Sequence, residues 1–231
     1  MPEQNHCNQC AIHNNNPLKM LQDEQLHDVS RCKTNIVFEK GDVIFKEGST
    51  LAGVYCISQG FCKLSKLCPN GKIQIVRFAC KGDILGQRSV ISREAVNLTA
   101  TALTHVKACF IPKDIIFESF ASNGKFSTEI FRNVCSELRK ADDAIVDFAQ
   151  KTAKQRLASS LLFLEEIFGK DPQAFINVQL SREEIGNMIG SATESLIRML
   201  SDFTKNKWIE THSKRIKILD RKQLEKISFG D

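Results

Sequence analysis

The chain lacks the features that direct a protein into or across a membrane. Its 231 residues contain no run of about 18 apolar side chains, which a membrane-spanning helix requires. Residues Met1–His6 do not form a basic segment followed by an apolar one, so no signal peptide is predicted. Without a secretory signal, the nine cysteines are expected to be reduced thiols in the cytoplasm, and their odd number cannot complete a disulfide framework.

Motifs typical of catalysis are also missing. The sequence shows no Ser/His/Asp order and no glycine loop that would cradle a phosphate. The neighbouring acids Glu183 and Glu184 open a predicted helix, where carboxylates suit the helix dipole, so they are not read as a catalytic pair. These absences argue against an enzyme.

Basic charge gathers in the C-terminal part of the chain. The net charge of the whole protein is +5, which is too small to indicate a nucleic-acid partner by itself. Between Arg198 and Lys217, however, six basic and two acidic side chains give a net charge of +4. This local excess has two interpretations, a solvated charged surface or a surface that binds nucleic acid.

The first 16 residues are polar and rich in asparagine, and we expect them to form an arm. Cys7 and Cys10 are separated by two residues and flanked by His6 and His13, which is a spacing used by metal ligands. The pattern leaves three interpretations open for the two cysteines: metal binding, thiol redox sensing, or neither.

The stretch from about Thr34 to Pro112 has the composition of a β-structure. Short apolar runs alternate with glycines, which is typical of an all-β barrel or roll. Val54–Ile57 and Ile73–Phe78 are strand-like. The intervening Pro69-Asn70-Gly71 predicts a hairpin turn, because Asn-Gly readily adopts positive φ.

A long helix is predicted from about Phe126 to Lys154, because this stretch has no Gly or Pro. About 25 residues correspond to about 38 Å of helix. Two small domains cannot easily cover so much apolar surface, so we expect the helix to pair with its own copy; the alternative is packing on the chain's own β-domain. The predicted dimer residues recur at helical intervals: Ile130, Val134, Leu138, Ile145 and Phe148.

Two short helices joined by a glycine are predicted in the C-terminal third. Ser181 with Glu184, and Ser191 with Glu194, have capping-box spacing, so each pair is expected to open a helix. Gly190 can adopt the left-handed conformation that ends the first helix. Two helices around one apolar seam form a helix-turn-helix, with the seam made of Ile185, Ile189, Leu196 and Leu200.

The second helix of such a motif enters the major groove of DNA, where its first turns face base edges. Glu194 can accept a hydrogen bond from cytosine N4, and Arg198 can bridge guanine O6 and N7. The alternative is a surface ion pair between them, since they are four residues apart on one helix. The predicted base contacts are Thr193, Glu194, Ile197 and Arg198.

Residues Lys207–Leu219 have the pattern of two short strands around a basic turn, which predicts a wing. Basic side chains at its tip would meet phosphates, and such contacts position a protein without reading sequence. Hydroxyl groups of the helices can also donate to phosphates. The predicted backbone contacts are Ser181, Ser191, Ser195, Lys214 and Arg215.

These motifs, in this order, resemble the Crp/Fnr superfamily of transcription regulators over nearly the whole chain. Lys40–Gly48 is similar to the family's first β-roll hairpin, and Tyr55–Gly60 and Gly82–Gly86 are similar to later β-roll signatures. The Glu-x-x-x-Arg core of the helix-turn-helix also matches. The resemblance implies a cyclic-nucleotide-binding-like sensor and a homodimer that binds an inverted-repeat operator of double-stranded DNA and contacts RNA polymerase.

The sensor pocket departs from the family's cyclic-AMP pattern, in which a Glu binds the ribose and an Arg-Ser pair holds the cyclic phosphate. Gln87 stands at the Glu position, and Leu98-Thr99 stands at the Arg-Ser position. A buried phosphate without its guanidinium is costly, so cyclic AMP is not expected. Arg88 or Arg93 could serve another anion. The implied effector pocket comprises Gly86, Gln87, Arg88, Ser89, Leu98 and Thr99.

Oxygen-sensing members of the family hold an iron–sulfur cluster through an N-terminal cysteine group and one distant cysteine. Such a cluster normally needs four thiolates. This chain offers only Cys7 and Cys10 before Cys32, so Cys32 and a β-roll cysteine would have to complete the set. The cofactor therefore stays open between a cluster, another metal and none. The β-roll cysteines are expected as core thiols: Cys56, Cys62, Cys80 and Cys109.

The predicted fold is α+β, with a polar arm over residues 1–16 and a jelly-roll-like β-roll sensor domain over 17–124. A dimerisation helix over 125–151 and a winged helix-turn-helix over 152–231 follow. We predict a sequence-specific DNA-binding transcription regulator. A small-molecule effector or redox signal in the β-roll would shift the dimer helix near Arg139–Phe148. The alternative is a cyclic-nucleotide-binding-type regulatory module that acts on a protein partner.

Overall fold

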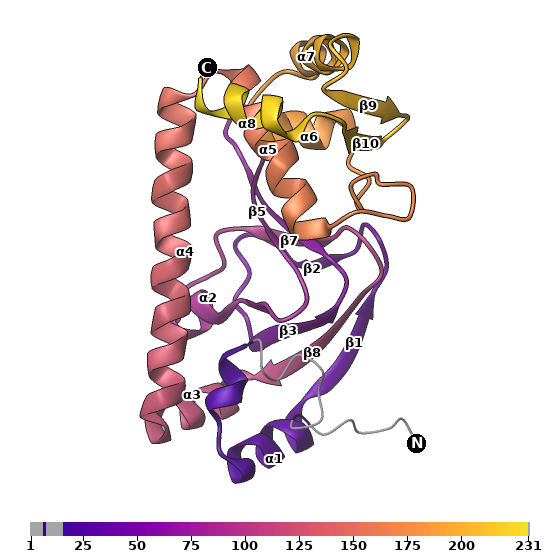
Figure 1. The fold of residues 1–231 in the computed structure, drawn as a ribbon. Helices are drawn as coiled ribbons and strands as arrows, with labels where there is room; N and C mark the ends of the chain where they lie inside the picture. Colours follow the sequence, from indigo (N-terminus) through magenta and orange to yellow (C-terminus); the bar gives the residue numbers. More distant parts are fainter. Residues whose placement is uncertain (1–6, 8–15, 231) are drawn as a thin grey trace. The chain divides into compact units, whose positions relative to one another are not determined.

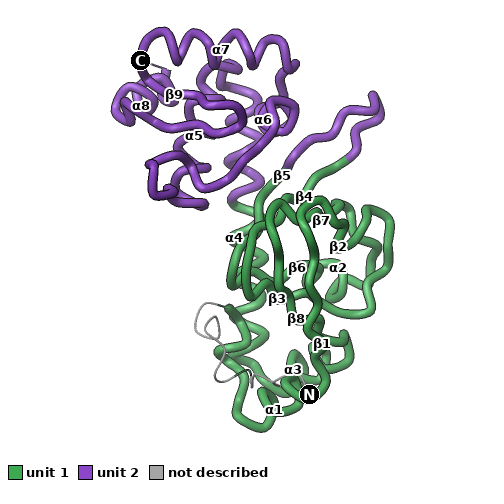
Figure 2. Tube along the Cα trace, turned by 90° about the vertical axis from the view of Figure 1, so that its right-hand side faces the viewer, with its two compact units in different colours: residues 1–66, 76–139 green, residues 67–75, 140–231 purple. Residues whose placement is uncertain are grey.

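The computed structural model describes Cys7 and residues 16–230, and the chain divides into two compact units. The first unit comprises residues 1–66 and 76–139, and the second comprises residues 67–75 and 140–231 (green and purple in Figure 2). Among the described residues, every helix is too short or too polar to span a lipid bilayer.

Two four-stranded sheets form the β-roll, with strand orders β1-β8-β3-β6 and β2-β7-β4-β5 (Figure 1). Antiparallel ladders join β1 to β8, β8 to β3, β3 to β6, β2 to β7 and β7 to β4. The strands are β1 (Thr34–Phe38), β2 (Val43–Phe45), β3 (Gly53–Gln59), β4 (Cys62–Leu67), β5 (Ile73–Ala79), β6 (Ile84–Leu85), β7 (Thr99–Ala102) and β8 (Val106–Pro112).

The predicted hairpin turn between β4 and β5 is confirmed. Gly71 has a φ of +78°, which an L side chain rarely adopts, and its N–H donates to the carbonyl oxygen of Cys68 at 2.9 Å. The side chain of Asn70 accepts a hydrogen bond from the N–H of Lys72 at 3.1 Å. Asn-Gly therefore supplies both the conformation and a local hydrogen bond for this turn.

The β-roll buries side chains on both faces of β3, because successive side chains of a strand point to opposite faces. Ile57 is fully buried in a core shared by the two sheets, together with Leu64 and Ala100. Cys56 faces the other way and packs in a second core with Phe126. Helices of the same unit contribute to this second core, namely η3 (Pro17–Met20), α1 (Asp23–Cys32), α2 (Gln87–Ser92) and α3 (Lys113–Ser122).

The long helix α4 spans Gly124–Gln150 and ends before the predicted Lys154. Thr152 explains the difference, because its side chain accepts a hydrogen bond from the N–H of Gln155 and opens a new helix, α5 (Ala153–Phe168). The side chain of Gln155 accepts in return from the N–H of Thr152, at 2.7 Å. This capping box was not recognised in the sequence.

One of the predicted dimer residues belongs to the core of the first unit. Ile130 is 2% exposed and packs in the same cluster as Phe126, so its assignment to a dimer face was wrong. Its neighbour Phe131 is 57% exposed. The start of α4 is apolar on two sides, and the sequence pattern does not show which of them faces the chain's own domain.

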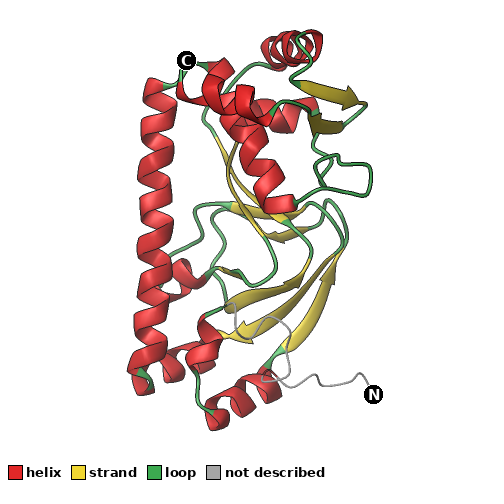
Figure 3. Ribbon diagram, viewed as in Figure 1, coloured by secondary structure: helices red, strands yellow, loops and turns green. Residues whose placement is uncertain are grey.

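The second unit is built on α5 and the helix α8 (Arg221–Phe229), which pack against each other (Figure 3). Glu165 of α5 is 7% exposed, and its carboxylate pairs with Arg221 at 2.7 Å and Lys170 at 3.1 Å. A buried carboxylate requires such partners. The other elements of this unit are α6 (Arg182–Ile189), α7 (Thr193–Lys205), β9 (Ile209–His212) and β10 (Arg215–Ile218).

Candidate nucleic-acid interface

The helices α6 and α7 form the predicted helix-turn-helix. The Ser181 side chain accepts from the N–H of Glu184 at 3.0 Å, and the Glu184 carboxylate accepts from the N–H of Ser181 at 2.8 Å. The first predicted capping box is therefore confirmed. Gly190 ends α6 in the left-handed conformation, with φ +64° and ψ +43°. Gly186 lets the turn approach closely, since a Cβ there would lie 2.9 Å from the carbonyl oxygen of Ser191.

The second predicted capping box is wrong. Helix α7 begins at Thr193, its N-cap is Ala192, and no side chain caps it. Ser191 remains part of the turn, because its N–H donates to the carbonyl oxygen of Gly186 at 3.0 Å. Glu194 consequently has no capping role and extends from the first turn of the helix.

The predicted seam between the two helices is confirmed. Ile185 and Ile189 of α6 are each 1% exposed, and Leu196 and Leu200 of α7 are at most 4% exposed. Burial of each such side chain contributes about 1.5–3 kcal/mol, so this seam fixes α7 against α6. The packing also determines which face of α7 is left in solvent.

The opposite face of α7 carries the predicted base contacts. Glu194, Ile197 and Arg198 are exposed, and Thr193 and Ser195 are half-buried. Residues three and four apart are neighbours on a helix, so the three exposed side chains share one surface. Within residues 16–230, neither Glu194 nor Arg198 forms an ion pair, so the surface-ion-pair alternative does not hold in this structure.

The two antiparallel strands β9 and β10 form the predicted wing, with Ser213 and Lys214 at the turn. Ser213 has a φ of +55°, and Lys214 is exposed. Arg215 is engaged within the protein instead. Its guanidinium forms a short ion pair with Asp171, donates to Gln173 at 2.7 Å and lies 4.1 Å from the ring centroid of Phe175. These three partners come from the loop that follows α5.

The contact with Arg215 helps to keep the carboxyl group of Asp171 ionised. Desolvation alone would raise the pKa of Asp171, but hydrogen bonds from Arg215 and from the N–H groups of Phe175 and Gln173 outweigh it and lower the pKa. Asp171 therefore stays ionised and holds Arg215. Of the two basic residues predicted at the wing, Lys214 is exposed, whereas Arg215 is bonded to the loop that follows α5.

Arg182, at the start of α6, is a functional candidate that the sequence reasoning missed. Its Nη2 donates to the carbonyl oxygen of Ser213 at 2.8 Å, while its Nη1 is buried without a hydrogen-bond partner among the described residues. Burial lowers the pKa of Arg182. Its position was the available signal, because a cation opposes the dipole at a helix N-terminus. A hollow of about 390 Å³ beside it is also lined by Ile197, Ser201, Thr204, Lys205 and Thr211.

The predicted effector pocket lies on β6, α2 and β7 of the first unit. Gly86 has a φ of +86°, and a Cβ there would lie 2.4 Å from Leu51 Cδ1, so Leu51 packs directly against this turn. Gln87 is 5% exposed, and its Oε1 has no hydrogen-bond partner in the described part of the chain. Ser89 is buried as well.

The remaining pocket residues are engaged locally. Arg88 is exposed and donates to the side chain of Asn97. Thr99 accepts a hydrogen bond from the N–H of Glu47 at 3.0 Å, and Leu98 is half-buried. Arg93 lies over the ring of Phe117, with its guanidinium carbon 5.4 Å from the ring centroid.

Comparison with known proteins identifies the family. Residues 155–227 match the Crp-like helix-turn-helix domain, and residues 35–123 match the cyclic nucleotide-binding domain. The chain is 30% identical to Electron transport regulator A of Shewanella oneidensis over 204 residues, which are 87% of this chain and 80% of that protein. The chain belongs to the Crp/Fnr family of transcription regulators.

Other Crp/Fnr relatives cover still more of the chain. It is 28% identical over 229 residues to the Fumarate and nitrate reduction regulatory protein of Vibrio cholerae, covering 96% of this chain and 90% of that one. A Crp/Fnr regulator from Eubacterium rectale has the same fold, with a TM-score of 0.79 at 21% identity over 94% of this chain and 100% of that one. FixK2 from Bradyrhizobium japonicum has a TM-score of 0.75 at 22% identity, over 84% and 96% of the two chains. As a Crp/Fnr member, the protein is a DNA-binding transcription regulator with a sensor domain.

The predicted effector pocket departs from the family's cyclic-AMP pattern at the positions that hold the phosphate. A cyclic phosphate carries a negative charge that needs a cation or several N–H donors when buried. The positions of the family's Arg-Ser pair hold Leu98 and Thr99, so neither position supplies a cationic side chain. Gln87 offers a buried amide where a carboxylate would meet ribose. Arg88, the cation among the predicted pocket residues, is exposed and donates to Asn97, so the positions of the Arg-Ser pair offer no guanidinium to a phosphate.

The cysteines that the structure describes give no complete ligand set for the iron–sulfur cluster that some Crp/Fnr members hold. Cys7 is 7% exposed, its N–H donates to Ser30 at 2.9 Å, and it packs in the core with Cys56. Cys10 lies outside the described residues. Among the described residues, no group of three or more His, Cys, Asp or Glu side chains could hold a metal ion. No step of the mechanism is therefore assigned to a cluster.

The β-roll cysteines are mainly core thiols, as predicted. Cys56 and Cys62 are at most 2% exposed, whereas Cys80 and Cys109 are half-buried. Desolvation, followed by the nearby Asp83 and Cys80, raises the pKa of Cys62 to about 12. The thiolate is the reactive form, so Cys62 is inert at neutral pH.

Proposed function

We propose that this Crp/Fnr regulator binds an inverted-repeat operator as a homodimer in the cytoplasm, with α7 of each protomer in the major groove. The observation that supports it most is the exposed pair Glu194 and Arg198, opposite the buried seam of α7. In helix-turn-helix proteins, this face of the second helix meets base edges. Family membership further supports a contact with RNA polymerase by the DNA-bound protein.

Each exposed side chain of α7 has a matching group in the major groove. Arg198 would donate to O6 and N7 of a guanine, and Glu194 would accept from N4 of a cytosine. Ile197 is 48% exposed on an otherwise polar surface, and the C5-methyl group of thymine is the apolar group that the groove offers. Thr193 would contact the base next to these positions.

The phosphate contacts would surround this reading surface. We keep the predicted phosphate contacts of Lys214 at the wing, Ser181 at the start of α6, Ser191 in the turn and Ser195 on α7 as part of this proposal. Arg182 joins them as a cation beside the wing, because its Nη2 donates to the carbonyl oxygen of Ser213 at the wing turn. Arg215 leaves the set, since Asp171 already neutralises it.

The dimer contact would run along the exposed apolar face of α4. Phe131, Val134, Leu138, Ile145 and Phe148 occupy the a and d positions of a heptad repeat, the pattern by which two helices pair. Four of the five are more than 40% exposed in the single chain. Phe131 takes the place that the sequence assigned to Ile130.

A signal in the sensor domain would control DNA binding through this dimer helix. The effector is a small molecule or a redox change, and the pocket chemistry argues against cyclic AMP. The residues that would contact a small effector are those around α2 and β7, where Gln87 has a buried acceptor without a partner.

Selection from a pool of random duplexes tests the proposal. The full-length protein is incubated with the pool, bound duplexes are sequenced, and the affinity for the best one is measured by fluorescence anisotropy at several salt concentrations. We expect an inverted repeat, and a log affinity that falls with log salt by about 0.9 per phosphate contact. Absence of salt-dependent binding would contradict the proposal and favour a regulatory module that acts on a protein partner.

A further inference from the structure

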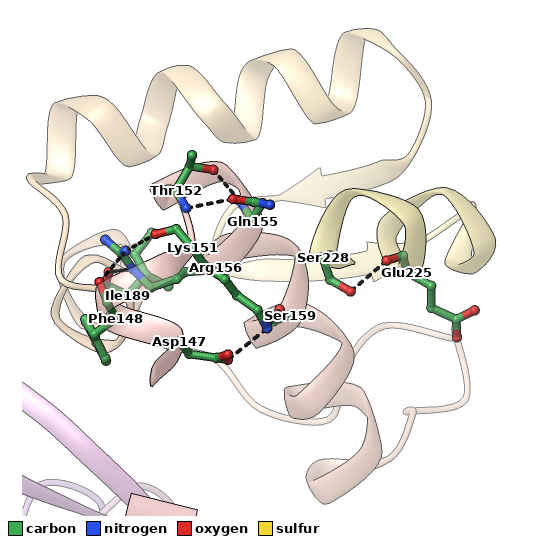
Figure 4. A network of polar contacts seen from close by, with 10 residues as sticks. All are labelled: Asp147, Phe148, Lys151, Thr152, Gln155, Arg156, Ser159, Ile189, Glu225 and Ser228. Atoms are coloured by element: carbon green, nitrogen blue, oxygen red, sulfur yellow. Dashed lines mark hydrogen bonds and ion pairs between the residues drawn. The ribbon is translucent and has the colours of Figure 1, made fainter. Parts of the chain in front are cut away.

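One arginine of α5 links the end of the long helix to the helix-turn-helix. Arg156 lies on the first turn of α5, and its guanidinium reaches carbonyl groups of two other helix ends (Figure 4). Its Nε donates to the carbonyl oxygen of Ile189 at 2.8 Å. Its Nη1 donates to the carbonyl oxygen of Lys151 in a short hydrogen bond and to that of Phe148 at 3.5 Å.

These contacts satisfy groups that helices leave unpaired. The last four carbonyl groups of a helix have no partner within it, and the negative end of the helix dipole attracts a cation. Phe148 is in the last turn of α4, and Ile189 is the last residue of α6. Because a guanidinium presents five N–H donors in a planar fork, Arg156 can serve both ends at once.

Phe148 adds an apolar contact at the same place. Its ring centroid lies 5.0 Å from the guanidinium carbon of Arg156. A Cβ at Gly190 would lie 2.8 Å from Cε1 of this ring, so the ring packs directly on the turn of the helix-turn-helix. Phe148 thus contacts the turn while standing at a d position of the proposed dimer helix.

The neighbouring residues add further contacts at this junction. Lys151 pairs with Asp147 one turn earlier at 2.9 Å and donates to Ser159 of α5 at 3.2 Å. Lys154 pairs with Asp202 of α7 at 2.7 Å. The first turns of α5 therefore contact the end of α4, the end of α6 and the recognition helix α7.

We propose that Arg156 is a positioning residue that sets the spacing between the two half-sites of the operator. By holding the end of the dimer helix against the helix-turn-helix turn, it fixes α7 relative to the two-fold axis. This inference rests on the proposed homodimer. One base pair changes the separation of two half-sites by about 3.4 Å and rotates them by about 35°, so a loosened junction should tolerate other spacings.

The test measures affinity for the selected inverted repeat, for versions with one base pair more or less between the half-sites, and for a single half-site. The variants Arg156→Ala and Arg156→Lys are compared with the wild type by anisotropy. Loss of hydrogen bonds from a charged donor typically changes an equilibrium by about tenfold or more. We therefore expect about a tenfold loss on the optimal spacing, with nearly unchanged binding to the single half-site. The preference for the optimal spacer should shrink accordingly.

Controls separate positioning from stability. Arg221→Ala removes an arginine of the same unit that pairs with Glu165 away from the junction, and should lower Tm without changing the spacing preference. Arg156→Lys keeps the positive charge but loses the planar set of N–H donors of the guanidinium. We expect this variant to fold and to prefer the optimal spacing less strongly than the wild type but more strongly than Arg156→Ala. An unchanged spacing profile in a folded Arg156 variant, or an equal loss on every duplex including the single half-site, would overturn the proposal. If the wild type bound a single half-site as tightly as the repeat, the homodimer itself would fail, and this inference with it.

Discussion

The recognition surface on α7 and the sensor pocket around α2 differ in what happens to their polar side chains. Glu194 and Arg198 extend into solvent, and neither has an ion-pair partner within residues 16–230. In the predicted pocket, Gln87 is buried, and the hydroxyl of Thr99 accepts a hydrogen bond from the N–H of Glu47. The two regions differ because the proposed reading surface of α7 keeps its charged pair in solvent, whereas Leu98 and Thr99 stand where cyclic-AMP-binding members of the family have an Arg-Ser pair.

The largest effect is expected for a substitution on the proposed dimer face, because operator binding should require two copies of α7. Ile145 is 67% exposed in the single chain and lies on the proposed dimer face. Ile145→Asp would bury an uncompensated charge there, at a cost of several kcal/mol per ion, and should convert the dimer to a monomer. Sedimentation measures the mass and anisotropy the operator affinity. A folded Ile145→Asp protein that remained dimeric and bound with unchanged affinity would contradict the dimer face.

A smaller effect is expected for a single base contact. Arg198→Ala should cost about 1–3 kcal/mol on the selected operator and relax specificity at one base pair of each half-site. The measurement is anisotropy on the selected operator and on versions substituted symmetrically at each position. An Arg198→Ala protein with the wild-type ranking of these duplexes would show that Arg198 reads no base.

A still smaller, uniform effect is expected at the wing. Lys214→Ala should weaken binding to all duplexes about equally and reduce the salt slope by about one. Arg215→Ala provides the matched control on the same wing, because Arg215 is bonded to Asp171 and Gln173. We expect it to lower Tm more than Lys214→Ala does. If Arg215→Ala instead reduced the salt slope and Lys214→Ala lowered Tm more, Arg215 would be the phosphate contact and Lys214 the structural residue.

Cyclic AMP is expected to have no effect on the protein. A ligand at 100 times its Kd stabilises a protein by about 2.7 kcal/mol, which is visible as a higher Tm. Leu98 and Thr99 stand where the family's Arg-Ser pair would supply a guanidinium for the phosphate. We therefore expect 1 mM cyclic AMP to leave Tm and operator affinity unchanged. A clear rise in Tm would show that Arg88 or another cation binds the phosphate.

The features that sequence alone predicted are those set by local periodicity. The β-roll, the hairpin at Asn70-Gly71 and the seam of α6 and α7 follow from alternation, turn chemistry and helical spacing. The Ser181 cap was predictable because its partner is only three residues away. Each of these features needs information from a short stretch of chain.

The features that were missed depend on contacts between distant parts of the chain. Arg215 pairs with Asp171, 44 residues earlier, and a basic residue at a wing tip looks the same with or without that partner. Ile130 and Phe131 are equally apolar, and only packing on the β-roll decides which one is buried. The Ser191 cap failed because the turn after Gly190 is one residue longer than the capping-box spacing assumes.

Hydroxyl-radical footprinting of the full-length protein on its selected duplex tests whether two copies of α7 bind DNA together, because it maps where the protein contacts the DNA. We expect two protected segments related by a two-fold axis, with centres about one helical turn, or about 34 Å, apart. In the Arg198→Ala protein, the footprint should weaken in both segments together. A single protected segment, or protection without sequence preference, would contradict the account.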